Sequence, residues 1–280
     1  MIHKLDEMTW MELDRLDRER TLILIPISPL EEHGPHLPIG TDVIAAADIA
    51  EQAAMQLAHK ASEHAIVLCP ATPLGCANIT ADFPGTISLR GTTLKNVVVD
   101  ICLAWVGQGF KYLLFCNHHL DPIHMKAILW AIEEVKAEHT VHIAETMSRS
   151  VYAGLENEVA THGQAMGLDM RFEIHADAKE AAYIRYRRPV LFKPDAAPLE
   201  PVRIDVRKGM QAGHTTFKQM GAEMGYIGSP AKSDPDFGRL HIEACTRQAV
   251  ELSLKLIRGE SLPVIDPKMW AFLDKFVNLD

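Results

Sequence analysis

The chain has 280 residues, a formal net charge of −9 at pH 7 and 48% hydrophobic residues. This apolar content is enough for a substantial buried core, and the length suits one large domain. The negative charge argues against nucleic acid or an anionic membrane surface as the main partner, because both attract basic patches. We therefore expect a small-molecule substrate.

The cysteines predict neither a disulfide framework nor a zinc finger, because they are scattered and include no C-x-x-C pair. They are Cys69, Cys76, Cys102, Cys116 and Cys245. The first 20 residues are charged throughout, unlike a signal peptide, and no apolar run approaches the roughly 20 residues of a membrane span. A cytoplasmic protein without membrane contact is the expectation.

Strand-like and helix-like segments alternate over the first half of the chain. Apolar residues from Leu5 to Leu16 have roughly helical spacing and predict a helical lead-in within residues 1–19. Buried strands are expected at 21–28, 65–69, 111–116 and 141–144, with helices at 43–60, 92–106 and 122–138. Pro122 suits a first helical position, where its missing N–H would be unpaired anyway. This alternation predicts an α/β three-layer sandwich with a mostly parallel sheet.

The second half of the chain is less regular. Helices are expected at 176–185 and 236–258, and a tail helix at 269–276 within residues 259–280. Residues 189–228 are rich in proline, glycine and polar residues, so we expect irregular structure there, packed on a neighbouring subunit. No repeat or clear linker occurs, which predicts a single domain over residues 1–280.

Three groups of potential metal ligands follow predicted strand ends. They are Glu31, His33, His36 and Asp42; His118, His119, Asp121 and His124; and His175, Asp177 and Glu180. Because the carboxyl ends of parallel strands share one edge of a sheet, we expect these groups to converge. Such mixed oxygen and nitrogen ligands suit Zn²⁺, Mn²⁺ or Fe²⁺, and Asp42 at a helix start is the natural bridge between two ions.

Each group also has a purely structural interpretation. Asp42, which follows Thr41, would serve as a helix N-cap worth about 1 kcal/mol. Asp177 and Glu180 are acidic residues in the first turn of a helix, where the helix dipole favours them. No G-x-S-x-G elbow, phosphate-binding loop or dinucleotide fingerprint occurs, so serine hydrolases, kinases and simple dehydrogenases lack their local signals.

The stretch E-E-H-G-P-H-L-P-I-G-T-D at residues 31–42 resembles the signature of the creatininase (creatinine amidohydrolase) family, E-x-H-G-x-H-L-P followed by T-D. The resemblance continues through Phe83-Pro84-Gly85-Thr86, Asn117-x-His119, His175-Ala176 with Glu180, and Gly228-x-Pro230 with Gly238-Arg239. It implies a creatininase-like α/β domain, a homohexamer and two divalent metal ions (Zn, Mn or Fe).

The resemblance also implies roles for individual residues. Glu31, Asp42 and His119 would hold one ion, and His33, Asp42 and Asp121 the other. His175 matches the family histidine that transfers a proton to the leaving group, and Glu180 matches an acidic position close to the metals. His36 and His124 are expected to support the ligands from behind.

The chain departs from the family pattern at two places. Residues 117–122 read N-H-H-L-D-P instead of N-G-H-G-G-N or N-G-H-Y-E-N, so a histidine replaces a glycine and the shorter Asp121 replaces a glutamate ligand. Before His175, residues 171–174 read R-F-E-I, without the tryptophan of creatinine hydrolases. We therefore expect a cyclic substrate other than creatinine, contacted by Thr86, His118, Leu120 and Arg171.

These features predict a metal-dependent hydrolase, in which a metal-bound hydroxide attacks a carbonyl of a small cyclic substrate and His175 protonates the leaving atom. A second hypothesis is C–C ring opening of a cyclic diketone such as 3-dehydro-scyllo-inosose, as in a branch of the family in inositol catabolism. A non-catalytic metal- or ligand-binding protein and a single-metal sugar isomerase or epimerase are further hypotheses.

Overall fold

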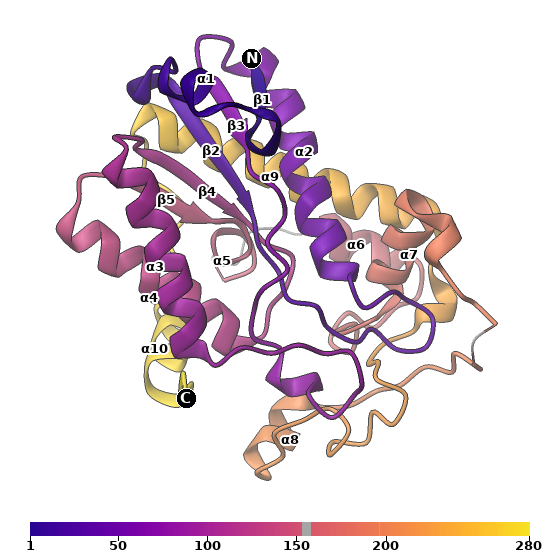
Figure 1. The fold of residues 1–280 in the computed structure, drawn as a ribbon. Coiled ribbons are helices and arrows are strands. Elements are labelled where there is room, and N and C mark those ends of the chain that lie inside the picture. The colour runs from indigo at the N-terminus through magenta and orange to yellow at the C-terminus, as the bar shows by residue number, and fades with distance from the viewer. Residues whose placement is uncertain (153–157, 196) are drawn as a thin grey trace.

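The protein is described by a computed structural model that covers residues 1–152, 158–195 and 197–280. Its described residues form a sheet of five parallel strands in the order β1-β3-β2-β4-β5 (Figure 1). The strands are β1 Ile2–Lys4, β2 Thr21–Pro26, β3 Ala65–Leu68, β4 Tyr112–Cys116 and β5 His142–Glu145. The predicted α/β fold with a parallel sheet is confirmed.

Helices connect and cover these strands. The described α-helices are α1 Trp10–Asp14, α2 Thr41–Lys60, α3 Gly91–Gly107, α4 Pro122–Glu138, α5 Thr146–Ser150, α6 Glu158–Ala165, α7 Ala178–Arg187, α8 Val206–Gln211, α9 Pro235–Arg258 and α10 Pro267–Phe276. Short 3-10 turns lie at Leu5–Glu7, Arg18–Arg20, Asn78–Thr80, Pro189–Leu191 and Pro230–Lys232. Among the described helices, none combines the length and apolarity that crossing a membrane requires.

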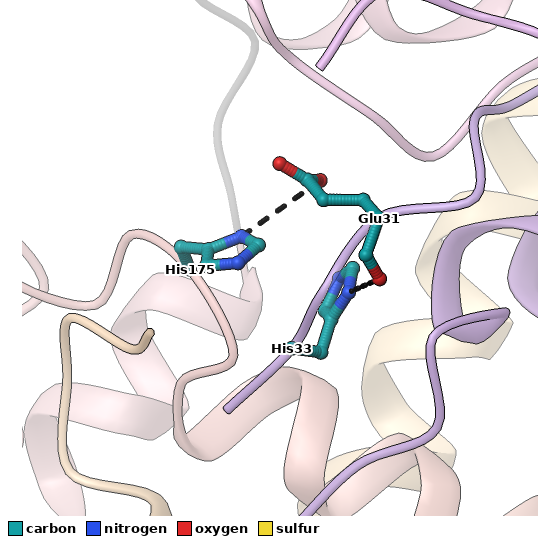
Figure 2. A group of neighbouring side chains, drawn as sticks. All are labelled: Glu31, His33 and His175. Atoms are coloured by element: carbon teal, nitrogen blue, oxygen red, sulfur yellow. Dashed lines mark hydrogen bonds and ion pairs between the residues drawn. The ribbon is translucent and has the colours of Figure 1, made fainter. Parts of the chain in front are cut away.

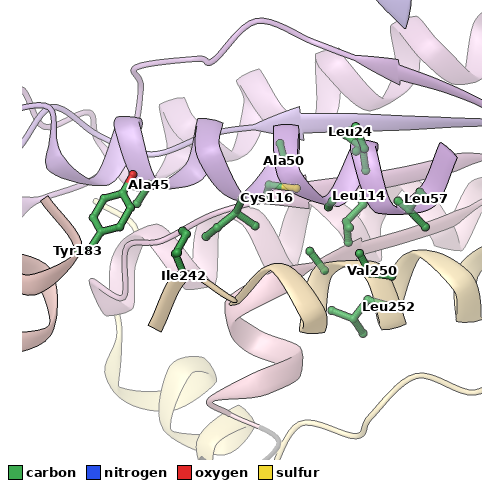
Figure 3. Packing of buried hydrophobic residues seen from close by; sticks show 14 of the residues in the cluster. Leu24, Ala45, Ala50, Leu57, Leu114, Cys116, Tyr183, Ile242, Val250 and Leu252 are labelled. Atoms are coloured by element: carbon green, nitrogen blue, oxygen red, sulfur yellow. The ribbon is translucent and has the colours of Figure 1, made fainter. Parts of the chain in front are cut away.

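Successive side chains of the central strands face two different helical layers, as the two-residue period of a strand requires. Leu22 and Leu24 of β2 are buried in a core that also contains residues of α2 and α9. Ile23 and Ile25 face a second core with residues of α3 and α4. Figure 3 shows part of the first core, where Leu57 and Val250 come from its two helices. The sheet is therefore the middle layer of three.

The path of the chain through these layers determines where a ligand site can form. The connection from β2 to β3 contains α2 on one face of the sheet, and the connection from β3 to β4 contains α3 on the other. Because β4 pairs with β2 on the side away from β3, the strand order reverses between β2 and β4. In open α/β sheets, ligands bind beyond the carboxyl ends of the strands at this reversal.

The N-terminal segment differs from the predicted helical lead-in. Residues 2–4 form the edge strand β1, whose Ile2 pairs with Ile66 of β3, and only Trp10–Asp14 is α-helical in residues 1–19. Leu5 and Leu13 pack on the α3 and α4 core, which explains their apolar spacing without a continuous helix. A strand of three residues is too short to show the two-residue period in sequence.

Helices α7 and α9 approach each other backbone to backbone. A Cβ atom at Gly238 of α9 would collide with the carbonyl group of Ala182 in α7, so glycine is required for this close contact. The contact holds α7 against the rest of the molecule. Since α7 contains Glu180, the packing also positions a side chain of the site described next.

Candidate metal centre

Hydrogen bonds tie together the loops that follow β2 and β4. The Ser28 hydroxyl donates to Asn117 Oδ1 at 2.9 Å, and the same oxygen accepts the backbone N–H of His119 at 2.9 Å. The side-chain amide of Asn117 donates to the His119 carbonyl at 2.8 Å. The buried asparagine therefore fixes the turn that presents His119 beside the loop containing Glu31.

Beyond these strand ends, the described residues contain three groups of side chains whose ligand atoms lie within 4.8 Å of one another. They are Glu31, His33 and His175; Glu31, Asp42 and His119; and His33, Asp42 and Glu180. Figure 2 shows the first group, with the Glu31 carboxylate directed toward the His175 ring. The predicted convergence of three distant segments is thus present in the fold.

Each of the three histidines has one ring nitrogen occupied by a backbone carbonyl. His33 Nδ1 donates to the Glu31 carbonyl at 3.0 Å, His119 Nε2 to the Cys76 carbonyl at 2.9 Å, and His175 Nε2 to the Glu32 carbonyl at 2.8 Å. The other nitrogen of each ring then faces the carboxylates. Metal-binding histidines are oriented in this way, because the outer hydrogen bond fixes the tautomer and aims the free nitrogen.

The carboxylates Glu31 and Asp42 lie between these free nitrogens. Glu31 Oε1 accepts the Thr80 hydroxyl at 2.7 Å, whereas Oε2 lies 3.0 Å from His119 Nδ1. Asp42 Oδ2 lies 3.1 Å from His119 Nδ1 and 3.7 Å from His33 Nε2. Within the described residues, neither buried Oε2 nor Oδ2 forms a hydrogen bond of acceptable geometry. Buried carboxylates that face ring nitrogens are satisfied by protons on those nitrogens or by a cation that binds both, and this donor set fits a metal ion.

Asp42 does not serve as the helix cap of the alternative interpretation. Gly40 occupies the N-cap position of α2, and no side chain caps this end. Asp42 lies in the first turn and belongs to two of the three ligand groups, which suits a carboxylate shared by two ions.

Glu180 is held at the site by an unusual backbone conformation. Its Oε2 accepts the Ala176 N–H at 2.6 Å and lies 3.7 Å from His33 Nε2. Ala176 has a φ of 45°, in the left-handed region that non-glycine residues rarely adopt. The strained residue turns the chain between His175 and α7, so that both side chains reach the same site.

The carboxylates dominate the electrostatics of the neighbouring rings. Burial opposes the charged imidazolium of His33, but Asp42 and Glu180 outweigh it and raise the pKa of His33 to about 10. Burial likewise opposes the charged form of Asp42, yet the surrounding histidines hold its pKa well below the usual range. The site therefore attracts positive charge strongly.

Asp121, which the family resemblance implies as a metal ligand, caps a helix in this structure. Its Oδ1 accepts the N–H groups of Ile123 at 2.7 Å and His124 at 3.2 Å, which makes Asp121 the N-cap of α4. The residue lines the cavity but belongs to none of the ligand groups found in the described chain. Glu180 instead completes the group with His33 and Asp42.

Two residues expected to contact substrate lie away from the cavity. The Arg171 side chain is 81% exposed and pairs with Asp169 at 2.6 Å. The Thr86 hydroxyl accepts the Glu32 N–H at 3.0 Å and so supports the loop from outside. Neither residue lines the cavity, whereas Leu120 does.

His118 lines the cavity but both of its ring nitrogens are engaged. Nδ1 lies 3.0 Å from Asp42 Oδ1, and Nε2 lies 2.8 Å from Nε2 of His241 in α9. Burial, followed by the proximity of His118, lowers the pKa of His241 to about 3. The histidine that replaces the family glycine therefore contacts Asp42, and the neutral His241 holds it there.

His36 and His124 lie behind the site in different ways. His124 Nδ1 accepts the Cys76 N–H at 3.3 Å, and its ring packs edge-on against His119. The His36 ring packs edge-on against Phe192 and Tyr226, and neither of its nitrogens has a hydrogen bond to the described residues. His124 thus supports a ligand directly, whereas His36 fills a largely apolar space.

The buried His36 should make the stability of the fold depend on pH. Burial lowers its pKa to about 4, against 6.5 for an ordinary histidine, so the unfolded chain binds a proton more readily between these values. Stability is therefore lost as the pH falls from 6.5 towards 4, by up to about 3 kcal/mol from this group. In thermal unfolding across this range, His36→Leu should show a shallower loss of stability than the wild type. The exposed His59 provides the control His59→Leu, and an unchanged slope in His36→Leu would contradict the assignment.

Four residues that organise the site were not predicted from the sequence. Thr80 and the carbonyl of Cys76 lie in the long connection between β3 and α3, and connections of this length often have a function. His241 lies on the buried face of a regular helix, where no local pattern distinguishes it from a core residue. Glu32 lies between the predicted ligands Glu31 and His33, and its backbone carbonyl accepts a hydrogen bond from the His175 ring.

The ligand groups open into a cavity of about 230 Å³. Glu31, Asp42, His119, His175 and Glu180 contribute to its polar floor. Segments from both halves of the chain close around it, including α8, which lies beyond the carboxyl ends of the strands (Figure 1). Residues 189–228 were expected to be irregular, but they include α8, which contributes Val206 and Met210 to the cavity.

A family of known proteins matches nearly the whole chain. A family model described as creatininase, creatinine amidohydrolase, matches residues 6–253. The chain belongs to the creatininase family. The predicted family and its hydrolase class are confirmed.

The relatives of this creatininase-family chain are named for two different activities. It is 21% identical to a creatinine amidohydrolase of Pseudomonas putida, over 77% of this chain and 88% of that protein. It is 34% identical to a mycofactocin precursor peptide peptidase of Mycolicibacterium smegmatis, but this match covers only 35% of the chain and 39% of the relative. A solved creatininase mutant complexed with creatine shares the fold, with a TM-score of 0.70, 20% identity, and coverage of 91% of this chain and 98% of that one.

Proposed function

We propose that this creatininase-family protein is a metal-dependent amidohydrolase that cleaves the C–N bond of a small amide. The observation that carries the proposal is the orientation of His33, His119 and His175. Each ring donates one N–H to a backbone carbonyl and directs its other nitrogen toward buried carboxylates. Carboxylates and unprotonated ring nitrogens that face one another in this way are stabilised by a bound cation.

Two ions would share Asp42 in this proposal. Glu31, Asp42 and His119 would hold one ion, and His33, Asp42 and Glu180 the other. Bound divalent ions would polarise the amide carbonyl and lower the pKa of a coordinated water. Zn²⁺ and Mn²⁺ suit these ligands, and solved creatininases of the same fold include a manganese form and a Zn–Zn form.

His175 is the residue we assign to proton transfer. Its Nε2 is held by the Glu32 carbonyl, so the ring cannot turn and Nδ1 remains directed toward Glu31, at 3.9 Å from Oε2. A proton held on Nδ1 lies at the polar floor of the cavity, where the leaving nitrogen of an amide would lie. The two relatives named above, an amidohydrolase and a peptidase, both have names that describe amide hydrolysis.

The proposal is tested by metal content and hydrolysis together. The protein is stripped with a chelator, reloaded with Zn²⁺ or Mn²⁺, and analysed for bound metal. It is then assayed with creatinine, simple amides, dipeptides and a cyclic diketone. Two ions per chain with metal-dependent amide cleavage would support the proposal. Cleavage by the fully stripped protein, or two bound ions without hydrolysis of any amide, would overturn it, and the second result would indicate a non-catalytic metal-binding protein.

A further inference from the structure

The cavity above the proposed metal ligands is polar at its floor and apolar on its walls. The apolar lining side chains are Ile79, Leu120, Ile174, Val206, Met210 and Phe217. They come from the loop after β3, the turn after β4, the segment before His175, and the chain in and around α8. Separate parts of the sequence thus contribute the same chemistry to one cavity.

Three of these lining side chains are also partly exposed to solvent. Leu120 is 37% exposed, Ile174 is 40% exposed and Met210 is 44% exposed. A single exposed apolar residue needs no explanation, but an apolar group gathered at a cavity indicates a binding surface. The carboxylates Glu31, Asp42 and Glu180 line the same cavity, so the apolar surface and the reactive groups can contact one ligand.

The charges of the lining side chains also favour an uncharged ligand. No lysine or arginine is among the side chains that line this cavity in the described residues. The nearby candidate Arg171 is exposed and paired with Asp169. Nothing in the lining is therefore suited to an anionic substituent such as a phosphate, and a polyhydroxylated ring would find few hydrogen-bonding partners on the walls.

The size of the cavity limits what can enter. Its volume of about 230 Å³ is below the roughly 300–1,000 Å³ of sites that enclose drug-sized ligands. The space suits an amide group and one neighbouring substituent, as a small molecule or as the end of a longer one.

We propose that the substrate is an amide that carries an uncharged aliphatic or aromatic group, and that this group packs against Leu120, Ile174 and Met210. This inference rests on the proposed amidohydrolase function and names its substrate class. Polar amides and polyols would be poor substrates, because their groups would lose water without gaining partners on the walls.

The test uses alkyl hydroxamates, whose binding can be measured without catalysis. The zinc-loaded protein is titrated by calorimetry with acetohydroxamate, butanohydroxamate, hexanohydroxamate and phenylacetohydroxamate. Affinity should rise about fourfold for each methylene that is buried. Met210→Gln should weaken hexanohydroxamate binding by about four- to fifteen-fold, which corresponds to one or two methylenes of contact, and Met210→Leu should restore it. Met224→Gln is the matched control, because Met224 is 46% exposed and lies outside this cavity.

The outcomes separate this inference from the proposed function. Affinity that does not depend on chain length, or that falls equally in Met210→Gln and Met224→Gln, would overturn the inference even if amides are hydrolysed. Length-dependent binding that Met210→Gln reduces would support it. If that dependence appeared while no amide was hydrolysed, the apolar site would stand and the hydrolase function would fail.

Discussion

Asp42→Asn is expected to lower the rate of amide hydrolysis strongly and to remove at least one bound metal ion. Asp42 Oδ2 lies 3.1 Å from His119 Nδ1 and 3.7 Å from His33 Nε2, between the two ligand groups that include this residue. Asparagine is uncharged and has an NH₂ group in place of one carboxylate oxygen, so it binds cations far more weakly than aspartate. The loss of several kcal/mol of transition-state stabilisation corresponds to a fall in kcat on the order of 10³-fold.

Metal analysis and initial rates measure this effect on the same preparations. Glu51→Gln is the matched control, because it removes a half-buried carboxylate from the same helix without approaching the site. Circular dichroism and thermal unfolding show whether each variant is folded. A folded Asp42→Asn protein with two ions and wild-type rates would refute the bridging role.

Glu180→Gln and Asp121→Asn are expected to give opposite results, although both remove one carboxylate charge from the cavity. Glu180 Oε2 lies 3.7 Å from His33 Nε2, so Glu180→Gln should weaken binding of one ion at least about 100-fold and leave one ion per chain. Asp121 caps α4 through two backbone N–H groups, and asparagine caps helices about as well as aspartate. Asp121→Asn should therefore retain both ions and nearly the wild-type melting temperature.

Stoichiometric titration with Zn²⁺ or Mn²⁺ distinguishes the two variants, and thermal unfolding reports on the helix cap. If Asp121→Asn lost one ion while Glu180→Gln kept two, Asp121 would be the ligand that the family resemblance implies. Our assignment of Glu180 would then be wrong. Each variant serves as the control of the other, because they differ chiefly in which carboxylate remains.

Much of the fold follows from local patterns in the sequence. The continuous apolar runs of β2 and β4 predict strands buried on both faces, because only such strands lack a polar side. Pro122 is found in the first turn of α4, as its missing N–H predicts. β1 was missed, because its three residues are held by pairing with β3 rather than by their own pattern.

In the candidate site, too, some residues could be placed from the sequence and others could not. Glu31, His33 and Asp42 are close in sequence and follow a strand that was predicted from its composition, so their place at the sheet edge follows from the chain itself. Arg171 is also close in sequence to His175, yet its side chain turns to Asp169 and water. Nearness along the chain does not determine the direction of a long, flexible side chain on an exposed turn.

The sequence by itself determined that the chain is an α/β protein whose polar residues gather at the carboxyl edge of a parallel sheet. Strand burial and helix periodicity are local properties, and a long motif identifies its family without coordinates. Only the tertiary structure decided that Glu180 joins His33 and Asp42 while Asp121 caps a helix, and that α8 closes the cavity with Met210. The reason is physical: a carboxylate binds whichever partner its backbone brings within about 3 Å, and that distance depends on how separate segments pack.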